Sequence, residues 1–196
     1  CVPLFFILRK DFMKNILVVS GHPDLSRSLA NSIILNDLAA ALPDAEIRRL
    51  DSLYPDGQLD IAAEQAAVSR ADIIVWQFPF SWYSLPALLK KWLDEVMVYG
   101  FAHGSQAKLD GKKLIVSFTA GAPVEAYGKD CPIPYSIEDF LPQFECTARL
   151  CRLDYQPPLY TAGINFLLRD DTEGVVRQTE LAHNHAHRLI ARLQEI

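Results

Sequence analysis

The sequence lacks any concentration of positive charge. Its formal net charge is −5 at pH 7, and no stretch gathers lysine and arginine into a basic patch. Proteins that bind a phosphate backbone depend on such patches, because each phosphate they neutralise releases counterions. We therefore expect no nucleic-acid partner.

The chain also lacks a hydrophobic run long enough to cross a membrane. A spanning helix needs ~20 apolar residues, and the run Val2–Leu8 is far shorter. It carries neither the basic region nor the cleavage site of a signal peptide. Residues 1–12 precede Met13, and we expect them to be an N-terminal extension outside the fold. Residues 13–196 are then expected to form one domain, since their number suits a single core.

Cysteine is scarce and is not spaced for a metal site or a redox pair. No two of the four cysteines form a C-x-x-C unit. They are Cys1, Cys131, Cys146 and Cys151. We expect free thiols, which are typical of a reducing compartment, and hence a cytoplasmic protein.

What the sequence does contain is an alternation of short β-rich runs with longer helical patterns. The predicted strands are Ile16–Ser20, Glu46–Leu50, Ile73–Phe78, Lys113–Phe118 and Leu159–Ala162. The predicted helices are Ser28–Ala41, Ile61–Arg70, Leu85–Val98, Ser136–Arg149 and Thr172–Gln194. This order predicts an α/β domain with a parallel sheet and helices on both faces. Ligands of such sheets bind beyond the carboxyl ends of the strands.

The loop after the first predicted strand indicates an anion site. It runs into the start of a helix, where free N–H groups favour negative charge. Ser26 and Ser28 add hydroxyl groups, and His22 and Arg27 can add positive charge. The loop matches neither G-x-G-x-x-G nor a P-loop. The alternative is that one of the two serines only caps the helix.

Two further loops lie at the same predicted edge. Phe80, Trp82 and Tyr83 follow the third strand, and three aromatic side chains in a loop need a partner surface. A flat conjugated ring and a dimer interface are both compatible with them. The small residues 119–122 follow the fourth strand and would let the backbone approach a ligand, although a tight turn alone explains them.

Three stretches together resemble the flavodoxin-like NAD(P)H:quinone oxidoreductases. They are H-P-x-x-x-x-S-x-A-N from His22 to Asn31, Leu53–Asp56 with Asp60 and Ile61, and VWQFPFSWYSLPALLKKWLD from Val75 to Asp94. The family includes small bacterial NAD(P)H oxidoreductases and the ancillary oxidoreductases of glutathione-gated potassium efflux systems. The likeness runs from Met13 to about Ile164.

The resemblance implies a flavodoxin-like fold whose five-stranded parallel sheet has the order 2-1-3-4-5. It implies bound FMN, a homodimer, and ping-pong transfer of a hydride from NADH or NADPH to a quinone-like acceptor. The alternative function is a flavin-binding regulatory subunit of a potassium efflux system, with a membrane transporter as partner and a position at the inner face of the membrane. A pure electron carrier ranks lower, because an aromatic loop suits a flat organic acceptor better.

The resemblance also assigns the site residues. The phosphate and ribityl end of FMN would be held by His22, Ser28, Leu29, Ala30 and Asn31. One side of the ring would be held by Phe80, Ser81, Trp82 and Tyr83, and the other by Thr119, Ala120, Gly121 and Ala122. Tyr127 is the catalytic candidate, and it stands alone because Lys129–Pro134 contains no counterpart of the histidine that follows it in the family.

No metal site is expected. Glu180, His183 and His187 share one face of the last predicted helix, with His185 nearby. A di-iron site would need a second Glu-x-x-His unit on another helix, and the sequence has none. We expect a solvated helix face instead.

Overall fold

A computed structural model describes residues 14–196, so the predicted extension of residues 1–12 lies outside the described part of the chain. The strands are β1 (Ile16–Ser20), β2 (Glu46–Arg49), β3 (Ile73–Pro79), β4 (Lys113–Thr119), β5 (Asp154–Tyr155) and β6 (Leu159–Thr161). The α-helices are α2 (Leu29–Ala41), α3 (Leu50–Leu53), α4 (Ile61–Arg70), α5 (Ala87–Val96), α6 (Pro142–Leu150) and α7 (Thr172–Glu195). Short 3₁₀ turns are η1 (Leu25–Arg27), η2 (Val124–Ala126), η3 (Glu138–Phe140) and η4 (Phe166–Leu168).

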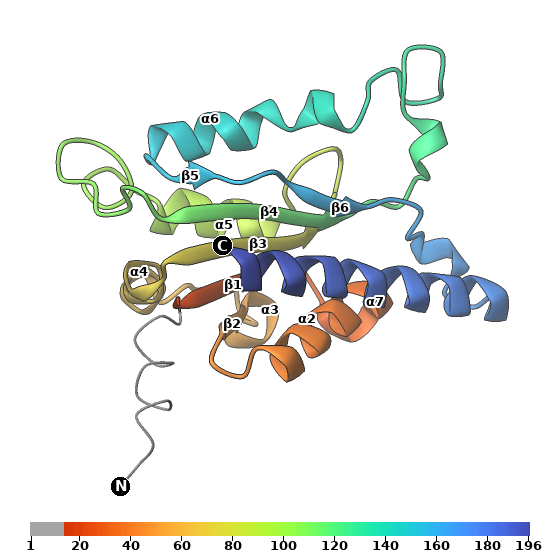
Figure 1. The fold of residues 1–196 in the computed structure, drawn as a ribbon, viewed down its shortest axis with the longest axis horizontal. Helices are drawn as coiled ribbons and strands as arrows, with labels where there is room; N and C mark the ends of the chain where they lie inside the picture. Colours follow the sequence, from red (N-terminus) through yellow and green to blue (C-terminus); the bar gives the residue numbers. More distant parts are fainter. Residues whose placement is uncertain (1–13) are drawn as a thin grey trace, which may run out of the picture.

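The strands form one parallel sheet in the order β2-β1-β3-β4-β5, with β6 also paired to β4 (Figure 1). The predicted flavodoxin-like order is thereby confirmed. The fifth position holds two short segments, not the single strand predicted. Pro157 and Pro158 lie between them, and proline has no N–H to donate to the ladder. The sequence analysis did not predict β5, which has only two residues.

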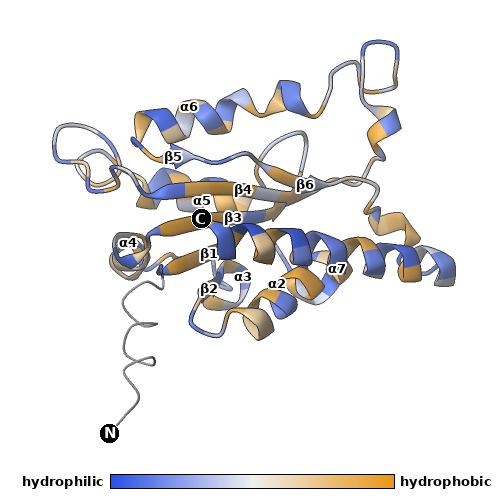
Figure 2. Ribbon diagram, viewed as in Figure 1, coloured by the Kyte–Doolittle hydropathy of each residue, from blue (hydrophilic) through white to orange (hydrophobic). Residues whose placement is uncertain are grey.

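Helices cover both faces of the sheet, as predicted, and each face has its own apolar core. Side chains alternate along the strands, so Leu17 of β1 joins the core under α3, α4, α5 and α6. Val18 joins the core under α2 and α7. The two helices of the second core lie against each other along one side of the sheet (Figure 1). Hydrophobic residues concentrate on the central strands, whereas α7 alternates polar and apolar positions (Figure 2).

Two predicted helices differ from the observed ones because of proline. Pro86 has an extended backbone with ψ 154°, so α5 begins after it and not at Leu85. The predicted helix Ser136–Arg149 is divided into η3 and α6. Pro142 is the first residue of α6, where its missing N–H costs nothing.

Candidate functional site

The start of α2 carries the first group of hydrogen-bond donors. The Ser28 hydroxyl accepts the Asn31 N–H at 3.1 Å and caps the helix. The N–H groups of Leu29 and Ala30 occupy the first turn, where a helix has no internal acceptor for them. Ser28 therefore caps α2, which is the alternative that the sequence analysis considered. The N–H groups of Leu29 and Ala30 remain available to bind an anion.

His22 lies next to this helix end. Its Nδ1 accepts the Asp24 N–H at 3.1 Å, so the proton of the neutral ring lies on Nε2. Burial lowers the pKa of His22, although Asp51 and Asp24 act in the opposite direction. His22 is thus neutral at pH 7 and offers a donor, not the positive charge that the sequence suggested.

The loops at the carboxyl ends of β1, β3, β4 and β6 line a cavity of about 330 Å³. The predicted site residues that line it are His22, Ser28, Leu29, Ala30, Asn31, Phe80, Thr119 and Gly121. Ser81, Trp82, Tyr83, Ala120, Ala122 and Tyr127 are not part of its lining. The structure therefore gathers the phosphate-end residues and only part of each predicted ring wall.

The cavity has lining residues that the sequence analysis did not assign. They are Pro79, Ile164, Asn165, Phe166, Arg169 and Gln178, and Arg27, which the sequence analysis placed in the anion loop, lines the cavity as well. Ile164, Asn165, Phe166 and Arg169 all follow the fifth predicted strand. That strand ends at the same edge of the sheet as the other strands. Because ligands bind beyond the carboxyl ends of parallel strands, the loop after this strand could also have been predicted to line the site.

Two arginines lie on one aromatic ring in this additional loop. The guanidinium carbon of Arg169 is 4.1 Å from the centre of the Phe166 ring, and that of Arg27 is 5.4 Å away. Cation–π contacts of this kind hold guanidinium groups in place. They put positive charge beside the free N–H groups of α2, which favours an anionic ligand.

The turn after β4 is fixed by backbone hydrogen bonds. The Ala120 N–H donates to the Thr161 carbonyl at 2.8 Å, and the Ala122 carbonyl accepts the Gly163 N–H at 3.0 Å. Ala120 is buried. A methyl group on Gly121 would meet only the Ile164 carbonyl, at 3.7 Å. The turn therefore brings backbone close to the cavity without requiring glycine there.

The aromatic loop after β3 is a tight turn with mutual hydrogen bonds between Ser81 and Ser84 at 3.1 and 3.0 Å. Trp82 and Tyr83, at its tip, have φ of 50° and 64°. Such values are uncommon for residues other than glycine, and this backbone strain is typical of functional loops. The Trp82 side chain is 93% exposed.

The rings of this loop divide between the cavity and the neighbouring helix. Phe80 lines the cavity and packs on Phe118, with ring centres 4.8 Å apart. Tyr83 stacks on Phe140 of η3 at 5.0 Å. The ring surface that faces the cavity is thus supplied by Phe80, and Tyr83 belongs to the adjacent aromatic cluster.

Tyr127 is half-buried at the end of η2 and packs against the core under α5 and α6. Burial, with a smaller contribution from Tyr83, raises the pKa of its phenol. Tyr127 is therefore protonated at neutral pH and can act as a proton or hydrogen-bond donor near the aromatic loop.

The histidines of α7 differ from the expected solvated face at one position. His183 and His187 are exposed, and His183 bonds to Asp37 of α2 at 2.6 Å. His185 is completely buried. The 3.6-residue helical repeat turns position 185 toward the sheet, where polar groups of β4 and β6 bond to both ring nitrogens.

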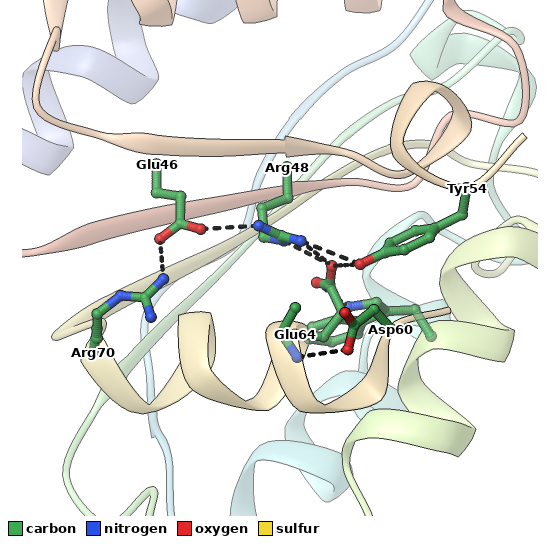
Figure 3. A network of polar contacts seen from close by, with 8 residues as sticks. Glu46, Arg48, Tyr54, Asp60, Glu64 and Arg70 are labelled. Carbon is green, nitrogen blue, oxygen red and sulfur yellow. Dashed lines mark hydrogen bonds and ion pairs between the residues drawn. The ribbon is translucent and has the colours of Figure 1, made fainter. Parts of the chain in front are cut away.

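The motif that contains Tyr54 and Asp60 has a structural role (Figure 3). The fully buried carboxylate of Glu64 accepts hydrogen bonds from Arg48 at 2.6 Å, Tyr54 at 2.6 Å and Trp92 at 2.8 Å. Asp60 caps α4 by accepting the Ala63 N–H at 3.0 Å. These bonds join β2, α4 and α5 on the side of the sheet away from α7, and they stabilise the fold.

The lining of the cavity combines two kinds of side chain. Backbone N–H groups, Ser28, His22 and two arginines supply donors and positive charge. Phe80, Pro79 and Ile164 supply apolar surface. A ligand that combines an anionic group with a flat apolar ring matches this lining.

Comparison with known proteins agrees with this fold. A family described as having a flavodoxin-like fold matches residues 14–185. General stress protein 14 of Bacillus subtilis (strain 168) is 38% identical over 157 residues, which cover 80% of this chain and 89% of that protein. The glutathione-regulated potassium-efflux system ancillary protein KefF of Enterobacter sp. (strain 638) is 40% identical over 158 residues, covering 80% and 88%.

Two solved structures are similar over most of the chain. One is general stress protein 14 of Treponema denticola in complex with FMN, with a TM-score of 0.80, 31% identity, and coverage of 91% of this chain and 99% of that one. The other is an NADPH-quinone reductase from P. pentosaceus, with a TM-score of 0.73, 26% identity, and coverage of 89% and 96%. None of the helices within residues 14–196 is long and apolar enough to cross a membrane.

Proposed function

The chain belongs to the flavodoxin-like family, and on this premise we propose that it is an FMN-dependent oxidoreductase. It passes a hydride from NADH or NADPH to a quinone or a similar aromatic acceptor. The observation that carries the proposal is the cavity at the carboxyl edge of the sheet, whose lining combines hydrogen-bond donors with apolar surface. The FMN complex of general stress protein 14 from Treponema denticola supports it.

The residues of the cavity fit FMN by their chemistry. The N–H groups of Leu29 and Ala30, the Ser28 hydroxyl and His22 would hold the phosphate end, with charge from the two arginines. Phe80 would pack on the ring, beside Ser81, Trp82 and Tyr83. Thr119 and Gly121 would approach it from the other side, in the turn that Ala120 and Ala122 complete. Asn31 would donate near the ribityl chain.

When bound, the flavin ring accepts a hydride and passes it on. The chain binds and orients the ring and brings the nicotinamide and then the acceptor to it. Tyr127 is the proposed donor of a hydrogen bond or proton to the reacting molecule, because its phenol is protonated at neutral pH and lies near the aromatic loop. The nicotinamide and the acceptor would occupy the same stacking position one after the other, and this order gives a ping-pong reaction.

The test is an absorbance spectrum of the purified protein followed by reduction with NADH or NADPH and reoxidation with a quinone. We expect a flavin spectrum, FMN and not FAD on release by heat, and parallel initial-rate lines. No flavin after reconstitution would refute FMN binding, and intersecting lines would refute the ping-pong order.

A homodimer with the site at its interface is part of this proposal. The exposed aromatic loop at Trp82 is the surface that a second copy would cover. We also propose a cytoplasmic location, in keeping with Cys131, Cys146 and Cys151, which are free thiols.

A second candidate function is that of a flavin-binding ancillary subunit of a potassium efflux system. The 40% identity to such an ancillary protein favours it. The chain would then act at the inner face of the membrane on a transporter. Co-purification with a potassium transporter, together with slow turnover of the isolated protein, would support this function over the enzyme.

A further inference from the structure

A continuous line of polar side chains, exposed at Arg188 and buried from His185 onward, connects the outer surface of α7 to the cavity. His185 bonds to Ser117 of β4 at 2.8 Å through Nε2 and to Thr161 of β6 at 2.9 Å through Nδ1. Arg188, one turn further along α7, donates to the Thr161 hydroxyl at 3.0 Å. The proposed function uses none of these four side chains.

The line continues from Ser117 to the wall of the cavity. Ser117 donates to the Gln77 carbonyl oxygen at 2.7 Å, and Gln77 donates to Asn31 at 3.0 Å. Asn31 donates to the Thr119 hydroxyl at 3.1 Å. Asn31 and Thr119 both line the cavity. Ser117, Gln77, Asn31 and Thr119 are all buried, so water does not replace these bonds.

Each hydrogen bond of the line has a defined donor and a defined acceptor. Ser117 has a single hydroxyl hydrogen and donates it to Gln77, so it must accept from His185. The Nε2 atom of His185 therefore carries the proton. Burial lowers the pKa of His185 to about 3, which leaves the ring neutral and its Nδ1 bare. Nδ1 then accepts the hydroxyl hydrogen of Thr161.

Arg188 sets this direction because a guanidinium can donate but cannot accept. Thr161 accepts from Arg188, and its own hydrogen is thereby directed to His185. At the other end, Thr119 accepts from Asn31 and keeps its hydroxyl hydrogen. No hydrogen bond within residues 14–196 uses that hydrogen, and Thr119 lies at the cavity wall.

We propose that Arg188 and His185 are positioning residues that orient this line of hydrogen bonds so that Thr119 presents its hydroxyl hydrogen to the ligand. If the line ran the other way, Asn31 would offer its carbonyl to Thr119, which would turn its hydrogen away from the cavity. A flavin ring has carbonyl and ring-nitrogen acceptors, so a donor in this position would favour it. The inference rests on the proposed function for the identity of that ligand.

The tautomer of His185 reports which groups of the line donate, and it can be measured without any ligand. In protein with ¹⁵N-labelled histidine, long-range ¹H–¹⁵N spectra distinguish the two neutral tautomers. We expect His185 to be the Nε2–H form at pH 7, and the Nδ1–H form to gain population in Arg188→Met. Arg192→Met is the matched control, because within residues 14–196 the Arg192 side chain donates to the Pro157 carbonyl and to no member of the line. An Nδ1–H or doubly protonated His185 in the unaltered protein would overturn the inference.

The effect on the ligand is measured by titrating the flavin-free protein with FMN and following fluorescence. Thr119→Val loses the hydrogen bond to the ligand and also the one accepted from Asn31. It should raise the Kd by at least roughly three- to tenfold, and Thr119→Ser, which keeps the hydroxyl, should bind like the unaltered protein. Arg188→Met should raise the Kd about two- to threefold, which is less than Thr119→Val does, because the Thr119 hydroxyl is still present. Arg192→Met should leave the Kd unchanged. Since Arg188 acts through Thr119, Arg188→Met should have no further effect when combined with Thr119→Val.

The outcomes separate the two proposals. Additive effects of Arg188→Met and Thr119→Val, or unchanged binding in Thr119→Val, would overturn the positioning role. His185→Phe and His185→Gln provide a second pair. The glutamine can donate to Ser117 and accept from Thr161, so it should retain more affinity than the phenylalanine. A protein that contains Nε2–H His185 but binds no FMN would refute the proposed function and leave the direction of the line in place.

Discussion

His185 shows how one buried side chain links stability to pH. Desolvation lowers its pKa to about 3 in the folded protein, whereas an unfolded histidine titrates near 6.5. Between these values the unfolded chain binds the additional proton, so unfolding is favoured as pH falls. The stabilisation is complete above about pH 6.5 and decreases by about 1.4 kcal/mol per pH unit below it.

We therefore expect the urea-unfolding free energy of the protein to fall more steeply between pH 6.5 and 4 than that of His185→Gln, which does not titrate. The two curves should converge toward acidic pH. The variant His187→Gln removes an exposed histidine of the same helix and should keep the slope of the unaltered protein. Equal slopes for all three proteins would show that His185 is not buried as a neutral ring.

Tyr127 is the residue on which the proposed chemistry can be tested most directly. Tyr127→Phe removes only a hydroxyl, and backbone N–H groups near the ring should share its role. We expect a loss of about tenfold at most, below the 10²–10⁴-fold typical of a sole general acid. Stopped-flow rates of the two half-reactions measure it, with Tyr135→Phe as the exposed control. A loss of 10³-fold would instead make Tyr127 an essential acid.

At the scale of elements, the end of β1 is held close to α5. A Cβ placed on Gly21 would contact the Cβ of Leu89 and lie 2.7 Å from its Cδ2. Leu89 is fully buried, so it has little space to move. The loop that begins at Gly21 contains the predicted anion site, and its position is set by this close packing.

Gly21→Ala should therefore destabilise the protein by about 1–3 kcal/mol, the range for overpacking a core. Thermal unfolding followed by circular dichroism measures this loss. Gly121→Ala is the matched control, because a methyl group there meets only one carbonyl oxygen, at 3.7 Å. We expect it to unfold close to the unaltered protein. A melting temperature of Gly21→Ala equal to that of the control would mean that α5 moves away freely.

At the scale of the whole molecule, the proposed homodimer makes a prediction about Trp82. This side chain is 93% exposed at the tip of a strained turn. Buried tryptophans at interface centres often contribute about 2 kcal/mol or more, which is roughly 30-fold in the dimer Kd. We expect a dimer by light scattering at micromolar concentration, and a weaker dimer together with weaker flavin retention in Trp82→Ala.

Leu150→Ala is the control for that experiment. Leu150 is an exposed apolar residue at the end of α6, just before β5, which pairs with the first residues of β4. It therefore lies at the opposite end of the sheet from the aromatic loop. A monomer with full activity would refute the dimer, and equal weakening by both substitutions would show that Trp82 has no special role.

The sequence by itself determined the order of the main elements and the edge of the sheet that carries the site. Continuous apolar runs and helical periodicity are local properties, and each strand that precedes a helix fixes a loop at the same edge. The resemblance of Val75–Asp94 and two shorter stretches to one family added the strand order. Pro86 and Pro142 set the starts of α5 and α6 by their missing N–H groups and restricted backbone.

Only the tertiary structure decided which side chains meet. Thr119, Asn31 and His185 are far apart in the sequence, and their hydrogen bonds exist because α2 and α7 pack on the same face of the sheet that contains β4. The helical spacing of Ala182, Ala186 and Leu189 places His185 on the apolar face of α7, but its partners Ser117 and Thr161 could not be read from the sequence. The arginines over Phe166 also join loops from opposite ends of the chain. Hydrogen-bond direction and desolvation depend on three-dimensional surroundings, and a one-dimensional pattern does not contain them.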